Sequence, residues 1–298
     1  MNELAFYKHY HEHIMFKLQN EVFDRFSLPI DQKTFDSEIL YKKITIPYMD
    51  FSITTLCSLS CKDCTEWIPY LKEKKIFSFD EIKKWLDNLF NNIEYVCFIT
   101  ILGGEPFLNP ELYKIVKYLL YLQSVGYIGY IRIVTNGTIV PKDNVIKLLS
   151  ESDVLVNISD YKNTGNNIKK LVEIFNQNNV KYFYANDFKW TDLGRPNGKK
   201  KLSYEQLSYY FETCFIKDCA LFIEGKLYHC GRTYIVEKNG WDNPKDNEMI
   251  DFNTKYSKES IINKILLFYS KTMLSTCAYC NEPQNSKPIE SAIQCSIQ

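Results

Sequence analysis

An α/β fold built on a parallel sheet or partial barrel is predicted from two observations. From about Tyr48 onward, short apolar segments typical of strands alternate with segments whose apolar residues recur at helical spacing. The chain has 298 residues, 45% of them apolar and 24% charged, which is enough to bury a stable core. This composition excludes disorder, collagen and coiled coil as descriptions of the whole chain.

The elements follow one another in a βα succession. A strand is predicted over residues 49–55. Ser78 and Glu81 then form a capping box for an amphipathic helix that ends near Phe90. Tyr95–Leu102 is apolar enough for a strand buried on both faces, and Pro110 at a first helical position opens a helix to about Gln123. Further strands are predicted over 128–134, 154–158 and 180–184, with helices over 143–149 and 168–177 between them.

Four segments are expected along the chain. Residues 1–48 form a helical extension in which His9 and His13 lie four apart, a zinc-binding spacing, but without a third ligand they are assigned no role. Residues 49–190 form the βα unit, and 191–206 form a linker or exposed loop that contains the run Lys199–Lys201. Residues 207–298 form a smaller unit with a hairpin around Gly225 and a helix over 259–273.

Charge and hydropathy exclude several classes of partner. The 36 Lys and Arg residues balance the 36 Asp and Glu residues, so no overall field draws the protein to nucleic acid or to an anionic membrane surface. The longest apolar stretch is too short to span a membrane, and the N-terminus lacks the pattern of a secretion signal. A cytoplasmic location is therefore expected. In that reducing compartment, ten cysteines indicate metal binding rather than disulfides.

Three cysteines form the most informative motif. Cys57, Cys61 and Cys64 are separated by three and two residues, on a loop that leaves the first predicted strand. A structural zinc site and a ferredoxin-type cluster each use four protein ligands. Three cysteines would leave one iron of a cluster open to a non-protein ligand. A zinc knuckle is the alternative for this motif.

The sequence here resembles the radical S-adenosylmethionine (SAM) superfamily, whose signature is this cysteine spacing after the first barrel strand. Asp63 departs from the aromatic or apolar residue that commonly precedes the third cysteine and packs on the adenine. Three further strand ends match the family. The resemblance implies that Gly103, Gly104, Glu105 and Pro106 bind the amino group of the SAM methionine, and that Thr135 and Asn136, with Ser159 and Asp160, hold the ribose and the methionine carboxylate.

The resemblance implies a partial (β/α)6 TIM-like barrel and reductive chemistry. A [4Fe–4S] cluster held by Cys57, Cys61 and Cys64 would bind SAM and transfer an electron to it, supplied by a donor of flavodoxin or ferredoxin type. The cleavage releases methionine and a 5′-deoxyadenosyl radical, which abstracts a hydrogen atom from the substrate.

A second set of cysteines lies in the last third of the chain. It resembles the auxiliary-cluster module, called SPASM or twitch, that follows the barrel in several of these enzymes as a small α+β domain with a second [4Fe–4S] cluster. Five cysteines compete for four ligand places, and Cys214 is preferred over Cys219. Cys219, if it is not a ligand, is a candidate hydrogen-atom donor, and a zinc ribbon is the alternative for the set. The five residues are Cys214, Cys219, Cys230, Cys277 and Cys280.

The expected function is that of a radical SAM oxidoreductase or epimerase. A polar, carbohydrate-like small molecule is favoured as substrate because 48 residues ahead of the barrel are too few for a leader-peptide-binding module. Maturation of a ribosomally made peptide is the enzymatic alternative. A zinc-stabilised binding protein without catalysis is the alternative from another class.

Overall fold

The structure is a computed structural model that describes residues 43–162, 167–186, 189–217, 219–245 and 247–295. The predicted N-terminal helix, with His9 and His13, lies outside the described residues. Within the described part of the chain, no helix is long and apolar enough to cross a membrane.

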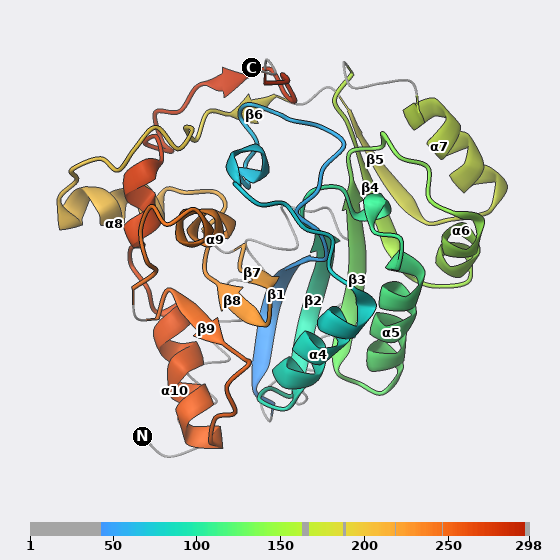
Figure 1. The fold of residues 1–298 in the computed structure, drawn as a ribbon, viewed down its shortest axis with the longest axis horizontal. Coiled ribbons are helices and arrows are strands. Elements are labelled where there is room, and N and C mark those ends of the chain that lie inside the picture. The colour runs from blue at the N-terminus through green and yellow to red at the C-terminus, as the bar shows by residue number, and fades with distance from the viewer. Residues whose placement is uncertain (1–42, 163–166, 187–188, 218, 246, 296–298) are drawn as a thin grey trace.

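Five parallel strands follow one another in chain order and form the main part of one sheet (Figure 1). Each neighbouring pair is parallel, and the apolar side chains of β2 are buried on both faces, as its sequence predicts. The strands are β1 (Thr45–Ser52), β2 (Tyr95–Leu102), β3 (Ile128–Thr135), β4 (Leu155–Asp160) and β5 (Tyr182–Asn186).

Four helices connect these strands and lie together along one side of the sheet (Figure 1). Their amphipathic faces bury residues such as Leu86, Leu119, Leu149 and Leu171, and Ser78 and Glu81 form the predicted capping box. The helices are α4 (Phe79–Phe90), α5 (Leu112–Ser124), α6 (Asp143–Ser150) and α7 (Asn167–Gln177). The alternation confirms the predicted α/β fold.

Several predicted boundaries were wrong. The strands predicted over 154–158 and 180–184 each end two residues later, and the helix predicted over 259–273 ends at Tyr269. β1 begins at Thr45 rather than at residue 49, because residues on both sides of Pro47 pair with β2. The proline is tolerated there since β7 pairs only with Asp50 and Phe51, farther along β1. The helix predicted to open at Pro110 begins at Leu112, because Pro110 lies in a turn ahead of the helix N-cap, Glu111.

The C-terminal part of the chain extends the same sheet beyond β1. β7 (Leu221–Ile223) pairs parallel with β1 and supplies the sixth parallel strand of the described residues. The predicted hairpin around Gly225 joins β7 to β8 (Lys226–Tyr228), and β9 (Met249–Asp251) completes the sheet. The sheet therefore crosses the boundary between the two units that the sequence predicts.

The remaining elements surround this end of the sheet. A short antiparallel pair, β6 (Trp190–Thr191) with β10 (Pro288–Ile289), lies near the C-terminal end of the described chain (Figure 1). Three α-helices and three 3₁₀ helices complete the described part of the fold: α8 (Tyr204–Glu212), α9 (Gly231–Lys238), α10 (Lys258–Tyr269), η3 (Ile68–Tyr70), η4 (Pro106–Leu108) and η5 (Ser275–Tyr279).

Candidate cluster and cofactor site

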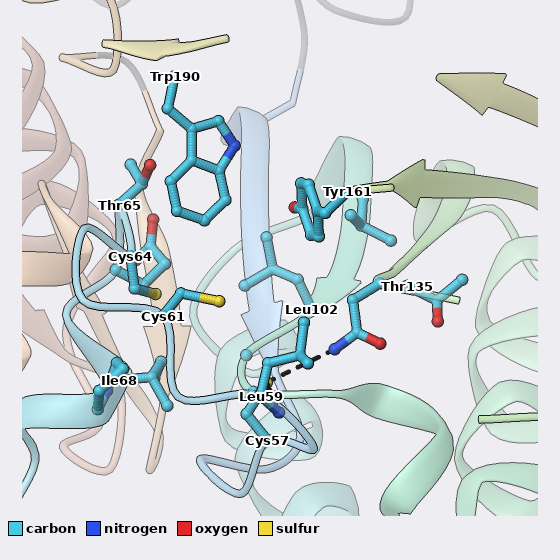
Figure 2. Close-up of a pocket in the computed structure, with 16 residues that line it drawn as sticks. Cys57, Leu59, Cys61, Cys64, Thr65, Ile68, Leu102, Thr135, Tyr161 and Trp190 are labelled. Atoms are coloured by element: carbon cyan, nitrogen blue, oxygen red, sulfur yellow. Dashed lines mark hydrogen bonds between the residues drawn. The ribbon is translucent and has the colours of Figure 1, made fainter. Parts of the chain in front are cut away.

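The three cysteines of the loop after β1 line one cavity of about 260 Å3 (Figure 2). Cys61 is buried, whereas Cys57 and Cys64 are half-buried. The cavity lies at the carboxyl ends of the parallel strands, because Gly103 and Gly104 after β2 also contribute to its wall. This is the edge at which ligands bind in α/β sheets of this kind.

The two glycines after β2 allow the cysteine loop to approach. The N–H of Gly104 donates to the carbonyl of Thr54 at 2.8 Å, and the N–H of Glu105 donates to the carbonyl of Leu56 at 2.8 Å. A Cβ atom on Gly104 would lie 1.8 Å from the Leu56 oxygen. Gly103 adopts a φ of 128°, which favours glycine. The Gly103–Gly104 turn therefore fixes the position of the segment that leads into Cys57.

Glu105 joins the ends of two strands from inside the fold. Its carboxylate is fully buried and accepts hydrogen bonds from the Thr135 hydroxyl, the Asn136 N–H and the Phe107 N–H at 2.8, 2.8 and 3.1 Å. Burial raises its pKa to about 7, although the three donors act in the opposite direction. The carboxylate is directed toward β3, and neither Glu105 nor Pro106 is among the residues that line the cavity.

Asn136 connects the end of β3 to the first cysteine. Its amide nitrogen donates to the Cys57 sulfur at 3.6 Å, drawn as the dashed line in Figure 2, and to the Ser58 hydroxyl at 3.1 Å. Its amide oxygen accepts from the N–H of Thr138 at 3.0 Å. Thr135 and Asn136 both line the cavity, where the resemblance places them.

The residues at the end of β4 lie differently. Ser159 and Asp160 are not among the residues that line the cavity. Asp160 instead accepts hydrogen bonds from the backbone N–H of Lys162, at 2.8 Å, and from the hydroxyl of Tyr184. The next residue, Tyr161, does line the cavity. Contact of Ser159 and Asp160 with a bound cofactor therefore stays a prediction.

An aromatic pair covers the cavity opposite Cys57 (Figure 2). Tyr161 and Trp190 meet edge to face with their ring centroids 5.2 Å apart. Sequence reasoning missed Tyr161, although its place directly after a strand end is a signal that could have identified it. Trp190 comes from β6, a short strand that the sequence does not predict.

Glu66 is the only residue with a charged side chain among the described residues that line the cavity. Burial raises its pKa to about 7, helped by the nearby Asp50 carboxylate and opposed by the Arg232 guanidinium. Sequence reasoning also missed Glu66, because nothing in its local pattern distinguishes it from a surface glutamate. A protonated or anionic oxygen is therefore available at the wall of the site.

The donor set of the loop suits an iron-sulfur cluster. Burial raises the pKa of Cys57 to about 11 and that of Cys64 to about 12, so the metal-free thiols are protonated at neutral pH. Iron would displace those protons. Among the described residues, no three His, Cys, Asp or Glu side chains lie close enough together to hold a single metal ion. The cysteines of a [4Fe–4S] cluster bind separate iron atoms, so the cluster does not require that convergence.

Four cysteines of the second set line another small cavity, of about 30 Å3. They are Cys214, Cys230, Cys277 and Cys280. Cys230 is the N-cap residue of α9, and Cys214 follows the end of α8. Cys277 lies within η5, and Cys280 is its C-cap residue. Cys219 is absent from the described lining of both cavities, and its thiol lies close enough to Tyr48 to influence the pKa of that residue.

Asp63, Lys199 and the two cysteines outside both sets take structural positions. Asp63 forms an ion pair with Arg195 at 2.6 Å. Cys97 is buried within β2, and the N–H of Cys295 donates to the carbonyl of Ser60 at 2.6 Å. Lys199 forms an ion pair with Asp242 at 2.5 Å, in the segment predicted as a linker.

The chain matches a known family from the end of β1 to just before β5. Residues 51–181 match the Radical SAM superfamily. The chain is 28% identical over 112 residues to a 7,8-dihydro-6-hydroxymethylpterin dimethyltransferase from Methanocaldococcus jannaschii, covering 37% of this chain and 21% of that protein. It is 27% identical over 118 residues to a GTP 3′,8-cyclase from Microcystis aeruginosa, covering 38% and 34%. The matched segment therefore spans about a fifth to a third of the length of these relatives.

A solved structure shares the fold over most of the chain. BtrN in complex with AdoMet and 2-DOIA matches with a TM-score of 0.52 and 14% sequence identity, covering 84% of this chain and 96% of that chain. This likeness shows a common fold.

Proposed function

Since residues 51–181 form a radical SAM domain, we propose that this protein reductively cleaves SAM and abstracts a hydrogen atom from a polar small molecule. One observation carries the proposal. The three cysteines of the motif, the Gly103–Gly104 turn and the Thr135–Asn136 strand end all line the same cavity. A loop that merely bound zinc would have no need for these other strand ends around it.

Different residues of the cavity would bind the cluster and SAM. Cys57, Cys61 and Cys64 would hold a [4Fe–4S] cluster, and the backbone of Gly103–Gly104 with the polar groups of Thr135 and Asn136 would hold SAM beside it. When bound, the cluster supplies the electron that converts SAM to methionine and a 5′-deoxyadenosyl radical, the species that removes hydrogen from the substrate. Asn136 keeps the first cysteine in place through its hydrogen bond to the sulfur.

The chain also excludes water from this chemistry. Tyr161 and Trp190 pack against each other opposite Cys57, and Leu59, Ile68 and Leu102 supply apolar walls. A dry, shaped cavity protects a radical from quenching and orients the substrate hydrogen.

The second cysteine set would hold an auxiliary [4Fe–4S] cluster. Support comes from the four sulfur-bearing residues that line one apolar cavity, Cys214, Cys230, Cys277 and Cys280, which match the four ligands such a cluster uses. Their arrangement favours Cys214 over Cys219 as the ligand. In a dehydrogenation this second cluster would accept the electron that the substrate radical must lose.

A polar small molecule is the proposed substrate class. Both curated relatives have names that refer to polar small molecules, a hydroxymethylpterin and GTP. Glu66 and Thr65 provide polar groups at the cavity wall, suited to hydroxyl or amino groups of a carbohydrate-like compound. A flavodoxin or ferredoxin type protein would supply electrons, and the reaction would end in dehydrogenation or epimerisation.

Metal analysis of anaerobically purified protein tests the two-cluster proposal. Brown protein with roughly seven to eight irons per chain is the expected result. Colourless protein with stoichiometric zinc would instead support the binding-protein alternative. Turnover in deuterated water then separates the two outcomes, because epimerisation places solvent deuterium at the inverted carbon and dehydrogenation does not.

A further inference from the structure

A buried arginine lies between the two cysteine sets. Arg232, in α9, is 2% exposed. Its guanidinium donates from Nε to the carbonyl of Thr65 at 2.9 Å, and from Nη1 to the carbonyl of Leu193 at 2.9 Å and the Cys280 sulfur at 3.1 Å. One rigid side chain therefore contacts the residue after Cys64 and a cysteine of the second set.

The same guanidinium is held by an aromatic ring of the first cysteine loop. Its central carbon lies 4.3 Å from the ring centroid of Trp67, which is fully buried. The Trp67 indole donates to the carbonyl of Gly194 at 2.9 Å, which fixes the ring. Stacking and fork-like donation are geometries that Arg satisfies and Lys does not.

A cation buried this deeply requires negative charge nearby. Glu66 and the sulfurs of Cys230 and Cys280 are the groups that act on Arg232 electrostatically. Leaving such a cation without a partner is strongly destabilising. Four thiolates that hold an iron-sulfur cluster would supply lasting negative charge next to the guanidinium, and that charge grows when the cluster gains an electron.

We propose that Arg232 is a positioning residue that joins the first cysteine loop to the second set and raises the reduction potential of the cluster held there. This inference rests on the second cluster of the proposed function. A hydrogen bond to a ligating sulfur and a nearby buried cation both stabilise the reduced cluster more than the oxidised one. The arginine thus makes the second cluster a better electron acceptor, as a dehydrogenation requires.

The test isolates the second cluster. The variant Cys57→Ser/Cys61→Ser/Cys64→Ser removes the first set, and the protein is reconstituted with iron and sulfide under anaerobic conditions. A redox titration followed by electron paramagnetic resonance then gives the potential of the remaining cluster with Arg232 intact, with Arg232→Met and with Arg232→Lys. Iron content is measured on each preparation.

Arg232→Met is expected to lower the equilibrium constant for reduction at least tenfold, which is about 59 mV for a one-electron couple. The reduction potential of Arg232→Lys should lie between those of the Arg232 protein and Arg232→Met. Lysine keeps the positive charge but cannot donate from several nitrogens at once as the guanidinium does. Lys200→Gln is the matched control. The Lys200 ammonium donates to the Cys280 carbonyl at 2.6 Å from an exposed position, where solvent screens its charge, so a change below threefold is expected.

Two results would overturn the inference. One is an unchanged reduction potential in iron-loaded Arg232→Met protein. Where that variant fails to hold iron, an unchanged reduction potential in Arg232→Lys has the same meaning. The other is an absence of iron in the triple variant with Arg232 intact. That second result would also refute the auxiliary cluster of the proposed function. The proposed SAM cleavage at the first cysteine set would still be testable in the wild-type protein.

Discussion

Glu105 and Asn136 are joined by a hydrogen bond of 2.8 Å between the buried carboxylate of the first and the backbone N–H of the second. Asn136 in turn donates from its side chain to the Cys57 sulfur. The ends of β2 and β3 and the first cysteine are therefore one hydrogen-bonded unit. The geometry of the cluster loop depends on strand ends that are far from it in sequence.

The pKa of Glu105 predicts a pH-dependent stability. Burial raises this pKa from 4.5 to about 7, so the folded protein binds more protons than the unfolded chain between these values, and stability falls as pH rises through that window. Glu105→Gln should weaken this pH dependence. The change in the free energy of unfolding across the window should become smaller by on the order of 3 kcal/mol. Urea unfolding of reduced, metal-free protein at pH 5, 6, 7 and 8 measures it. The raised pKa of Glu66 changes the stability in the same direction. Parallel curves of unfolding free energy against pH for wild type and Glu105→Gln would contradict the raised pKa of Glu105.

Gly104→Ala should disrupt the cluster loop without unfolding the sheet. The new Cβ would lie 1.8 Å from the Leu56 oxygen, so the segment before Cys57 must move. A displacement of about 1 Å at a reacting centre can cost about a hundredfold in rate, and we expect 5′-deoxyadenosine formation to fall by that order. Gly126→Ala is the control: its Cβ would have no atom within 4 Å, so it closes no approach, and the strain from its φ of 84° falls on an exposed turn away from the cavity. Equal activity of the two variants would show that the close approach has no role.

The two competing cysteines of the second set should respond differently. Cys214 lines the second cavity and Cys219 does not, so Cys214→Ser should lose about four irons per chain and Cys219→Ser should lose none. Iron analysis after reconstitution measures this. Cys219→Ser with full iron but without turnover would support the hydrogen-atom donor role. The reverse pattern of iron loss would refute the assignment of Cys214.

Cys61→Ser should abolish formation of 5′-deoxyadenosine and leave the second cluster in place. Its sulfur lines the first cavity and accepts a hydrogen bond from the Gln294 amide at 3.4 Å. Cys97→Ser is the matched control, because Cys97 is buried in β2 away from both cavities and should retain cleavage. Residual cleavage by Cys61→Ser near the wild-type level would mean that this loop does not hold the cluster.

The sequence predicts the parallel part of the fold well because its signals are local. The bounds of β2 match the structure, since an unbroken apolar run between polar turns identifies a strand buried on both faces. The pairing of β7 with β1 could not be predicted, because β7 has three residues and its partner lies about 170 residues away in the chain.

The site residues were predictable where a sequence motif follows the end of a strand. They were not predictable where the direction of a side chain decides what it contacts. Cys57, Gly104 and Asn136 line the cavity, as the order of their strand ends indicates. The inward turn of Glu105 and the contacts of Arg232 with Thr65 and Cys280 depend on packing between distant segments, which spacing along the chain does not encode.

Cleavage of SAM by the loaded protein tests the central claim most directly. Anaerobically reconstituted wild-type protein is mixed with dithionite and SAM, and 5′-deoxyadenosine is measured by liquid chromatography against Cys61→Ser treated in the same way. We predict that the nucleoside accumulates with the wild type alone. Wild-type protein that carries a full complement of iron and releases no 5′-deoxyadenosine would contradict the account.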